Sequence, residues 1–232
     1  MCVNLKPLCY LYANFIHLLF IQIMKRICLL MLSSAVAFSL ALTSCNSGSK
    51  CTGSCCNGEN ECKKYNPAIE NIFARKSVRN YDSVKTISAE NIELIVKAGM
   101  AAPSGMNKQP WQFFVFSGKE EMATLSQKLP YAKMLKNAPA AIVVLGNPEI
   151  SKLWYLDCAA ATQNILLAAE SLGIGAVWTA GFPYDDRMNA INTALNIPEP
   201  WLPLALIPMG YPAGENLPKD KWDPAKVHYN KW

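Results

Sequence analysis

The segment between Leu153 and Pro183 constrains the fold more strongly than any other part of the sequence. Its only charged side chains are Asp157 and Glu170. Residues 153–172 predict a long helix that is apolar nearly all round, and a helix of this kind is buried. A single domain of this size rarely encloses a helix completely, so we expect the helix to lie at a dimer interface.

Shorter elements surround this segment. Helices are predicted over residues 68–74, from Ser88 to Ala102, over 119–129 and over 185–195, and strands over 111–116, 140–145, 176–178 and 202–209. Ser88 is expected to be an N-cap. The apolar run 140–145 is typical of a central strand covered on both faces. Pro203 and Pro208 predict that the last strand is irregular or near a sheet edge.

An apolar leader precedes the body of the protein. Lys25 and Arg26 are followed by the apolar residues 27–42 and then by Leu42-Thr43-Ser44-Cys45, which resembles a bacterial lipobox. A secretory signal of this kind has to be set aside before the fold is considered. We predict that residues 1–44 are a lipoprotein signal, that Cys45 carries the lipid, and that the protein is anchored in the cell envelope, facing the periplasm or the surface.

Residues 1–23 add nothing that such a signal needs, so Met24 is the expected start of translation. A transmembrane anchor is the alternative interpretation of the leader. A comfortable span needs about 18 or more apolar residues, and the run after Arg26 is short and rich in serine. The lipoprotein signal is therefore the preferred prediction.

Nine cysteines are many for this length. Residues 45–66 are predicted to be a flexible tether, which holds Cys45 and the cluster Cys51, Cys55, Cys56 and Cys62. In an exported protein we expect disulfides within this cluster. A metal or iron–sulfur site is the alternative, although the spacing matches neither paired C-x-x-C nor the ferredoxin run. Cys158, in the domain, is expected to be a buried structural thiol.

Charge and motif content exclude several classes of function. The chain has 22 basic and 17 acidic residues, and removal of Lys6, Lys25 and Arg26 with the leader leaves 19 and 17. The mature protein is therefore nearly neutral and has no basic patch that indicates nucleic-acid binding. Only His228 remains, so a His-based triad or a His-rich metal site is hard to build. The phosphate loop, the dinucleotide fingerprint, the G-x-S-x-G elbow and H-E-x-x-H are missing.

Two polar clusters in the first half of the domain are candidates for ligand binding. Arg75-Lys76-Ser77-Val78-Arg79 offers three cations and a hydroxyl, which suit a phosphate or another anion. A solvated basic helix end is the alternative. The loop 102–111 offers Ser104, Asn107 and Gln109, which suit a planar heterocycle with carbonyl and N–H edges. An ordinary capped loop is the alternative there.

Two further clusters lie in the second half. Thr179, Ala180 and Gly181 follow a predicted strand and could present backbone N–H groups to a ligand. Lys219 and Lys221, in the C-terminal tail, could complete an anion site with Arg75 and Arg79, although such lysines are usually just solvated. The tail ends in aromatic residues, which is unusual for disordered chain and indicates an arm that packs on something.

Together and in this order, the clusters resemble the nitroreductase family of FMN flavoproteins. The resemblance is carried by residues 72–81, by 102–113, by the helix 157–169 with Leu172-Gly173-Ile174-Gly175, and by Met209-Gly210-Tyr211-Pro212. It covers about residues 67–232, which form the predicted FMN domain. The resemblance implies an α+β fold with a central mixed sheet flanked by helices, and an intertwined homodimer with a C-terminal arm.

FMN is expected at the subunit interface, held by both chains. The implied binding residues are Arg75, Lys76, Ser77, Arg79, Pro103, Ser104, Asn107, Gln109, Ala180, Gly181, Lys219 and Lys221. By the resemblance, the residues of 75–79 hold the phosphate and the N1/O2 side, and those of the loop approach from the partner subunit. Ala180 and Gly181 offer N–H groups to N5 and O4. Ala180 stands where some members carry an acid, and Lys221 where many carry Arg.

The implied activity is an FMN-dependent oxidoreductase that moves hydride or electrons from NAD(P)H, or another donor, to a nitroaromatic, quinone or similar acceptor by a ping-pong mechanism. The flavin carries the chemistry, so no catalytic side chain and no metal are expected. A non-catalytic or specialised flavin-binding lipoprotein of the envelope is the alternative. A disulfide oxidoreductase is disfavoured because the sequence has no thioredoxin-like C-x-x-C.

Overall fold

The computed structural model describes residues 65–232. The leader, Cys45, the tether up to residue 64 and its cysteine cluster lie outside the described residues. The predictions made for them therefore stay predictions. Within the described range, no helix is both long enough and apolar enough to cross a membrane.

The observed elements follow the predicted ones closely. The helices are α2 (Pro67–Ala74), α3 (Ala89–Met100), α4 (Lys119–Lys128), α5 (Trp154–Ser171) and α6 (Asp185–Leu195), and the strands are β1 (Trp111–Phe116), β2 (Ala140–Gly146), β3 (Gly175–Ala176), β4 (Thr179–Ala180) and β5 (Leu202–Gly210). The N-cap prediction is confirmed, because the Ser88 hydroxyl accepts a hydrogen bond from the Asn91 N–H at 3.2 Å. Of the predicted strand 176–178, only Ala176 lies in a strand, β3, and residues 177 and 178 lie between β3 and β4.

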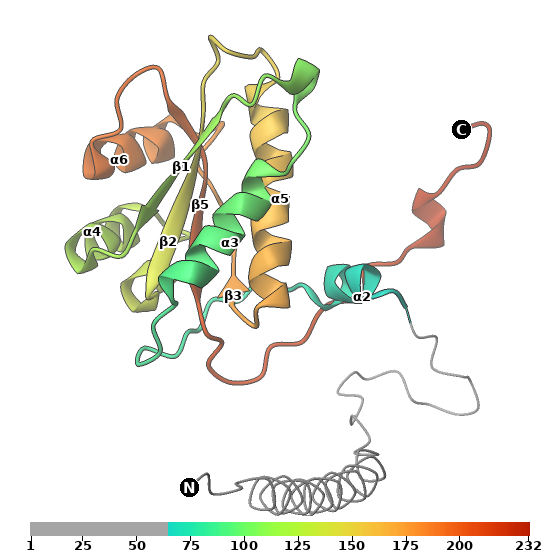
Figure 1. Ribbon diagram of the computed structural model, residues 1–232, viewed down its shortest axis with the longest axis horizontal. Helices are drawn as coiled ribbons and strands as arrows, with labels where there is room; N and C mark the ends of the chain where they lie inside the picture. Colours follow the sequence, from blue (N-terminus) through green and yellow to red (C-terminus); the bar gives the residue numbers. More distant parts are fainter. Residues whose placement is uncertain (1–64) are drawn as a thin grey trace, which may run out of the picture. The chain divides into compact units, whose positions relative to one another are not determined.

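The sheet has the order β1-β2-β5-β3, and β4 also pairs with β5. All of these strand pairs are antiparallel. Parallel pairing in the described part of the chain is confined to an isolated bridge between Ser77 and Ala176. Helices α3 and α5 cover one face of the sheet, and α4 and α6 cover the other (Figure 1). The α+β architecture is as predicted, but the predicted mixed sheet is not, because the named strands of the described chain all pair antiparallel.

Strand β2 shows why the core has two halves. All seven of its residues are buried. Ile142 and Val144 pack on the side of α3 and α5, whereas Ala141, Val143 and Leu145 pack on the side of α4 and α6. The continuous apolar run thus reflects burial on both faces, as expected for a central strand.

Of the two alternatives predicted for the last strand, irregularity is confirmed, because its register with β2 shifts between Val144 and Leu145. A position near the sheet edge is wrong, because β5 pairs with β2 on one side and with β3 and β4 on the other. The carbonyl of Pro203 accepts from the Phe182 N–H at 2.9 Å, and that of Pro208 from the Val177 N–H at 3.3 Å. In an antiparallel pair, a residue's N and C=O point to the same side. Both prolines therefore direct their donor-less nitrogen toward the short strands, away from the β2–β5 pairing.

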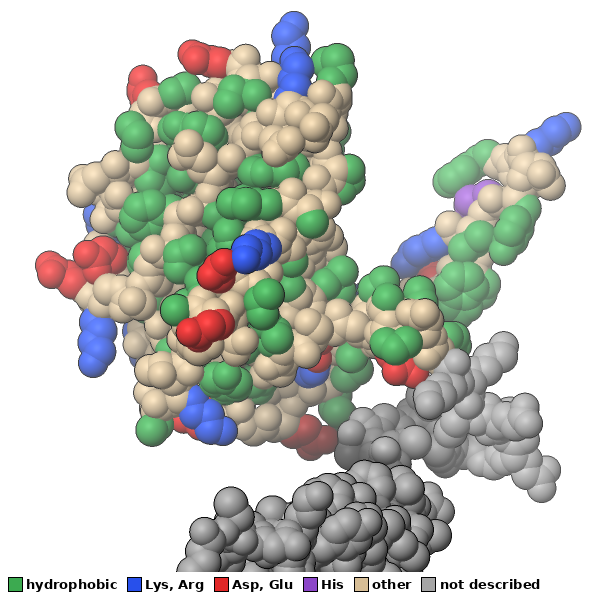
Figure 2. Space-filling view, viewed as in Figure 1, with side chains coloured by type: hydrophobic (Ala, Val, Ile, Leu, Met, Phe, Trp, Pro, Cys, Tyr) green, Lys and Arg blue, Asp and Glu red, His purple; other side chains and the backbone are tan. Residues whose placement is uncertain are grey.

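Helix α5 is buried on one side only within a single chain. Ala161 and Ile165 are completely buried against the sheet, whereas the Leu156 side chain is 54% exposed. The predicted all-round burial is therefore incomplete in one subunit. Figure 2 shows hydrophobic side chains at the surface on the face that α3 and α5 cover.

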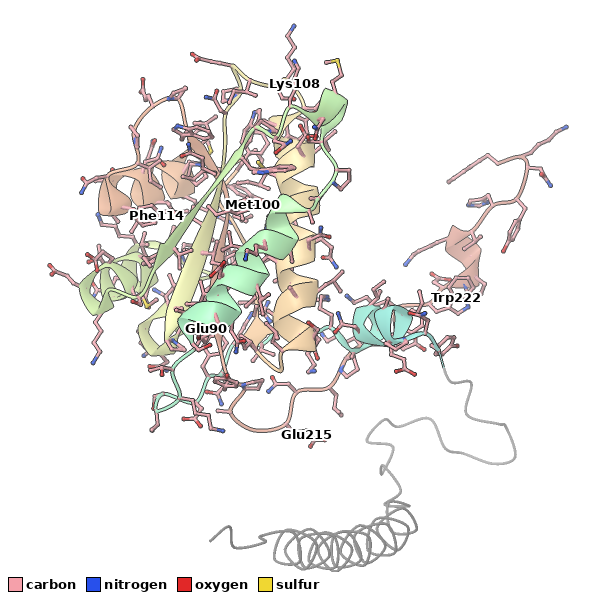
Figure 3. All side chains as sticks on the ribbon, in the orientation of Figure 1. Glu90, Met100, Lys108, Phe114, Glu215 and Trp222 are labelled. Carbon is pink, nitrogen blue, oxygen red and sulfur yellow. The ribbon has the colours of Figure 1, made fainter. Side chains whose placement is uncertain are left out.

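The C-terminal arm, defined here as residues 213–232, makes few contacts with the rest of the described chain. Its start is tied to Asn80, whose backbone C=O accepts from the Ala213 N–H at 2.9 Å. Beyond Ala213, the hydrogen bonds found within the described residues are internal to the arm. Trp222, labelled in Figure 3, is 72% exposed, and Trp232 is fully exposed. Large exposed aromatic side chains indicate a surface that another molecule covers.

Candidate functional site

The loop of the second polar cluster is held at the N-terminal end of α5. Asp157 is buried, and its Oδ1 accepts from the Gly105 N–H at 2.9 Å. Its Oδ2 accepts from the Ser151 hydroxyl at 3.2 Å. A carboxylate in the first turn of a helix is stabilised by the helix dipole. Asp157 therefore fixes the position of the loop that contains Ser104, Asn107 and Gln109.

The first polar cluster is held at the other end of α5. The Lys76 Nζ lies 2.6 Å from Glu170 Oε1, and both side chains are largely shielded from solvent. The prediction that Lys76 binds a cofactor is not supported by this geometry, because its charge is neutralised by Glu170. Lys76 instead attaches the segment 75–79 to α5.

Strand β3 positions the next residues of that segment. The Val78 N–H donates to the Ala176 C=O at 3.0 Å, and Ser77 forms the parallel bridge to the same residue. A Cβ on Gly175 would come within 2.7 Å of the Val78 side chain, so glycine permits this close approach. The contact leaves the Ser77 and Arg79 side chains exposed on either side of the buried Val78.

The same strand edge continues to Ala180. Thr179 and Ala180 pair with Leu206 and Ala205, and the Gly181 N–H donates to the Leu204 C=O at 2.9 Å. In an antiparallel ladder, the N–H groups of successive residues point alternately toward and away from the partner strand. Since the Gly181 N–H points toward β5, the Ala180 N–H points away from it. Ala180 can thus offer its N–H to a ligand, as predicted. The same prediction for Gly181 does not hold, because its N–H is used inside the sheet.

A groove of about 470 Å³ opens along this edge. Its lining combines cations, aromatic and other apolar side chains and the strand edge: Arg79, Pro130, Tyr131, Lys133, Met134, Trp178, Thr179, Ala180 and Arg187. None of these residues is acidic. Arg79 and Ala180 both line this groove. They are 101 residues apart in the chain, and the sequence predicted that they belong to one site.

The loop at the N-terminal end of α5 has an unusual backbone. Met106, Asn107 and Gln109 all have positive φ angles, of 52°, 54° and 47°. Each non-glycine residue in this region costs of order 1–3 kcal/mol, and such conformations cluster at functional sites. The Gln109 N–H donates to the Ser104 hydroxyl oxygen at 3.0 Å, and its side-chain amide donates to Asn107 Oδ1 at 3.0 Å. These bonds define the conformation of the loop, and Pro103 lies exposed beside it.

One chain does not bring all the predicted residues together. Asp157 and Glu170 are 13 positions apart on α5, which corresponds to about 20 Å along a helix. The loop 103–109 and the segment 75–79 therefore lie at opposite ends of the helix (Figures 1 and 3). Lys219 and Lys221 lie exposed in the C-terminal arm and form no ion pair among residues 65–232.

Sequence reasoning missed two kinds of residue. Asp157 and Glu170 were noted only as the charges that interrupt an uncharged segment, yet each anchors one predicted cluster. A lone carboxylate in an otherwise uncharged helix was the available signal. The groove residues Tyr131, Lys133 and Arg187 had no such signal, since they come from polar surface segments brought to the groove by the tertiary fold.

Cys158 follows Asp157 and is completely buried. Its Sγ lies 3.5 Å from the Leu145 C=O. Burial, and secondarily the charge of Asp157, raises the pKa of the Cys158 thiol to about 12. A thiol that stays protonated is a poor nucleophile, in agreement with the predicted structural role.

Comparison with known proteins decides the family. Residues 72–129 and 121–211 match the sequence pattern of the nitroreductase family. The chain is 43% identical over 171 residues to an Archaeoglobus fulgidus protein named "Putative NADH dehydrogenase/NAD(P)H nitroreductase", covering 71% of this chain and 98% of the relative. This chain belongs to the nitroreductase family.

Solved structures of nitroreductases agree with this assignment. A Bacteroides thetaiotaomicron protein with the same name is 51% identical, with a TM-score of 0.71, and the match covers 73% of this chain and all of that one. A nitroreductase from Bacteroides fragilis, solved with bound FMN, is 29% identical with a TM-score of 0.60, and the match covers 72% and 100% of the two chains. The fold described above is thus the nitroreductase fold.

Proposed function

We propose that this protein is an FMN-dependent oxidoreductase that takes reducing equivalents from NAD(P)H and delivers them to a nitroaromatic, quinone or similar conjugated acceptor. The observation that carries the proposal is the groove in which Arg79 and the free N–H of Ala180 lie along one strand edge. Membership of the nitroreductase family and the bound FMN of the Bacteroides fragilis relative support it.

The residues of the groove fit FMN. An isoalloxazine ring needs a flat apolar wall, a hydrogen-bond donor at its N5/O4 edge and a positive charge at its N1/O2 side. Trp178 supplies apolar surface, Ala180 the donor and Arg79 the charge. Two further predicted residues of the first polar cluster, Arg75 and Ser77, precede Arg79 on the segment that is fixed to β3. They would bind the phosphate through charge-assisted hydrogen bonds.

The protein's contribution to the reaction is positioning and electrostatics. When bound, FMN supplies the hydride chemistry. Arg79 would hold the N1/O2 side of the ring by its positive charge, and the Ala180 N–H would orient the N5/O4 edge. The groove admits donor and acceptor in turn, consistent with a ping-pong sequence. For a nitro acceptor, NAD(P)H loses a hydride while the nitro group gains that hydride and one proton, which gives a nitroso group and water.

We propose further that two copies of the chain complete each site. The segment 75–79 and the loop 103–109 lie about 20 Å apart in one chain. If two α5 helices pack antiparallel about a twofold axis, the N-terminal end of one lies beside the C-terminal end of the other. This arrangement brings the loop of one subunit to the groove of its partner, covers Leu156, and gives the arm with Lys219 and Lys221 a surface to pack on. Light scattering of the purified protein should give twice the chain mass.

The location of the protein remains a separate proposal. We propose that the mature chain begins at Cys45, which carries lipid, and that the domain faces the periplasm or the cell surface. The lipobox-like residues 42–45 support it. Several acyl chains on one cysteine give stable anchoring where a single chain is marginal. Mass spectrometry of the native N-terminus tests it, and an unmodified Met1 or Met24 would contradict it.

The decisive test is an anaerobic titration of the purified full-length protein. The visible flavin absorption should be present after purification, disappear on addition of NADH or NADPH, and return on addition of a quinone. Arg79→Ala should lower the FMN content because at least one charge-assisted contact is lost, while Lys119→Ala, an exposed cation on α4, should leave it unchanged. Bound flavin that neither nicotinamide reduces would instead support the non-catalytic alternative.

A further inference from the structure

The groove contains two cations that the proposed FMN contacts do not use. Arg187 lies in the first turn of α6, and Lys133 begins the short 3-10 helix η3 (Lys133–Asn137). Both line the groove together with Arg79 and Ala180. Within residues 65–232, neither forms an ion pair with a carboxylate, although Asp185 and Asp186 directly precede Arg187.

The guanidinium of Arg187 is held in place by two aromatic rings. It lies 3.8 Å from the centroid of the Tyr184 ring and 4.9 Å from that of Tyr131. Cation–π contacts restrain the side chain and leave the N–H groups free to donate in the guanidinium plane. Arg187 is thus a restrained, half-buried cation whose hydrogen-bonding capacity is not used by a carboxylate of the described chain.

Lys133 adds a second positive charge. Its Nζ contacts only a backbone carbonyl, that of Gln127 at 3.4 Å. The groove therefore has three cations, Arg79, Lys133 and Arg187, among its lining residues and no acid that would cancel their charge. A site of this kind favours a ligand that carries its own negative charge.

Resting on the proposed function, we propose that Arg187, assisted by Lys133, selects acceptors that are planar, aromatic and negatively charged, such as an aromatic carboxylate. The ring of the acceptor lies on the Tyr131 and Arg187 side of the groove, against the flavin face that Trp178 does not cover. Its carboxylate accepts hydrogen bonds from the Arg187 guanidinium. The neutral amide of the same acceptor lacks this interaction and is reduced less efficiently.

The test compares two probes of nearly equal shape, 4-nitrobenzoate and 4-nitrobenzamide, as acceptors for the FMN-loaded full-length protein. The wild type should show a higher kcat/KM for the carboxylate, and added salt should reduce the preference. Arg187→Gln should lower the ratio of the two kcat/KM values about tenfold, the loss of one charge-assisted hydrogen bond. Lys133→Gln should lower it by a smaller factor.

Lys119→Gln is the matched control, because it removes the same charge from an exposed position outside the groove lining. Its ratio should equal that of the wild type. Reduction of both probes at equal efficiency by the wild type would overturn this inference and leave the proposed function intact. Reduction of neither probe, nor of any quinone, would instead count against the proposed function.

The phosphates of NAD(P)H are the other possible source of negative charge. All measurements are therefore repeated with 1-benzyl-1,4-dihydronicotinamide, a neutral donor without phosphates. The Arg187→Gln effect on the acceptor ratio should persist with this donor. If the effect disappears and the variant instead raises the KM for NAD(P)H, then Arg187 binds the donor and the proposal for the acceptor is wrong.

Discussion

The two ends of α5 hold their neighbouring segments by different means. At the N-terminal end, Asp157 is buried, accepts hydrogen bonds from the Gly105 N–H and the Ser151 hydroxyl, and is favoured by the helix dipole. At the C-terminal end, Glu170 is disfavoured by the dipole and is compensated by the charge of Lys76. One end thus depends on desolvated hydrogen bonds and the other on charge pairing and close packing.

The largest effect is expected at the buried end. Asp157→Ala leaves the Gly105 N–H and the Ser151 hydroxyl without their acceptor and should lower the free energy of unfolding by about 2–4 kcal/mol. Chemical denaturation measures this loss. Asp157→Asn retains one side-chain oxygen and should cost less than half as much. Equal losses for the two variants would show that the charge, rather than the hydrogen bonds, holds the loop.

Packing at the opposite end gives the next effect. Gly175→Ala places a Cβ 2.7 Å from the Val78 side chain and should destabilise the protein by about 1–3 kcal/mol, with a lower FMN affinity because Arg79 is displaced. Gly173→Ala is the control. Gly173 has a φ of +69° and no atom within 4 Å of its added Cβ, so its cost of about 1 kcal/mol is conformational and should leave FMN affinity unchanged. Titration with FMN separates the two variants.

The charge pair should contribute less. A double-mutant cycle with Lys76→Met and Glu170→Gln should give a coupling energy of about 1 kcal/mol, between the values for exposed and buried pairs. The coupling should fall as salt is added, because the pair is partly accessible to ions. The loss on Asp157→Ala should be nearly independent of salt. A salt-independent coupling at Lys76 would remove the distinction between the two ends.

The smallest effect at neutral pH concerns Cys158. The pKa of the Cys158 thiol is about 12 in the folded protein, whereas that of an exposed thiol is about 9. The unfolded state therefore binds fewer protons above pH 9, so this group lowers stability as pH rises from 9 to 12 and has no effect at pH 7. The native Cys158 thiol should stay unmodified by iodoacetamide at pH 8, and peptide mass spectrometry distinguishes it from the other eight cysteines. Rapid modification of the Cys158 peptide would contradict its burial.

Local patterns predicted most of the fold. Residues 140–145 had the composition of a strand buried on both faces, and Ser88 marked the start of α3; both are found. The position of β5 was misjudged, because its prolines were interpreted without knowing which side their nitrogens face. That orientation depends on the register with β2, β3 and β4, which is a tertiary property.

The site was predicted less completely. Arg79 and Ala180 share the groove, yet Lys76 and Gly181 have their polar groups occupied by Glu170 and Leu204. A sequence motif shows which residue types are present, but it does not show which hydrogen-bond partners they have in the fold. Arg187 was overlooked because, of the two rings that restrain it, only Tyr184 is a neighbour in the sequence, whereas Tyr131 lies 56 positions earlier in the chain.

Residues 177 and 178 separate β3 from β4 beside the groove, and their number is constrained by the strand pairing. The pairing of Ala176 with Met209 and of Thr179 with Leu206 keeps one register across the gap, opposite Pro208. The path from Ala176, where Val78 is bound, to Ala180 therefore spans four residues of extended chain, about 13 Å. Inserting or deleting one residue here would reverse the direction of the Ala180 N–H. The pairing on both sides of the gap therefore fixes the length of this stretch.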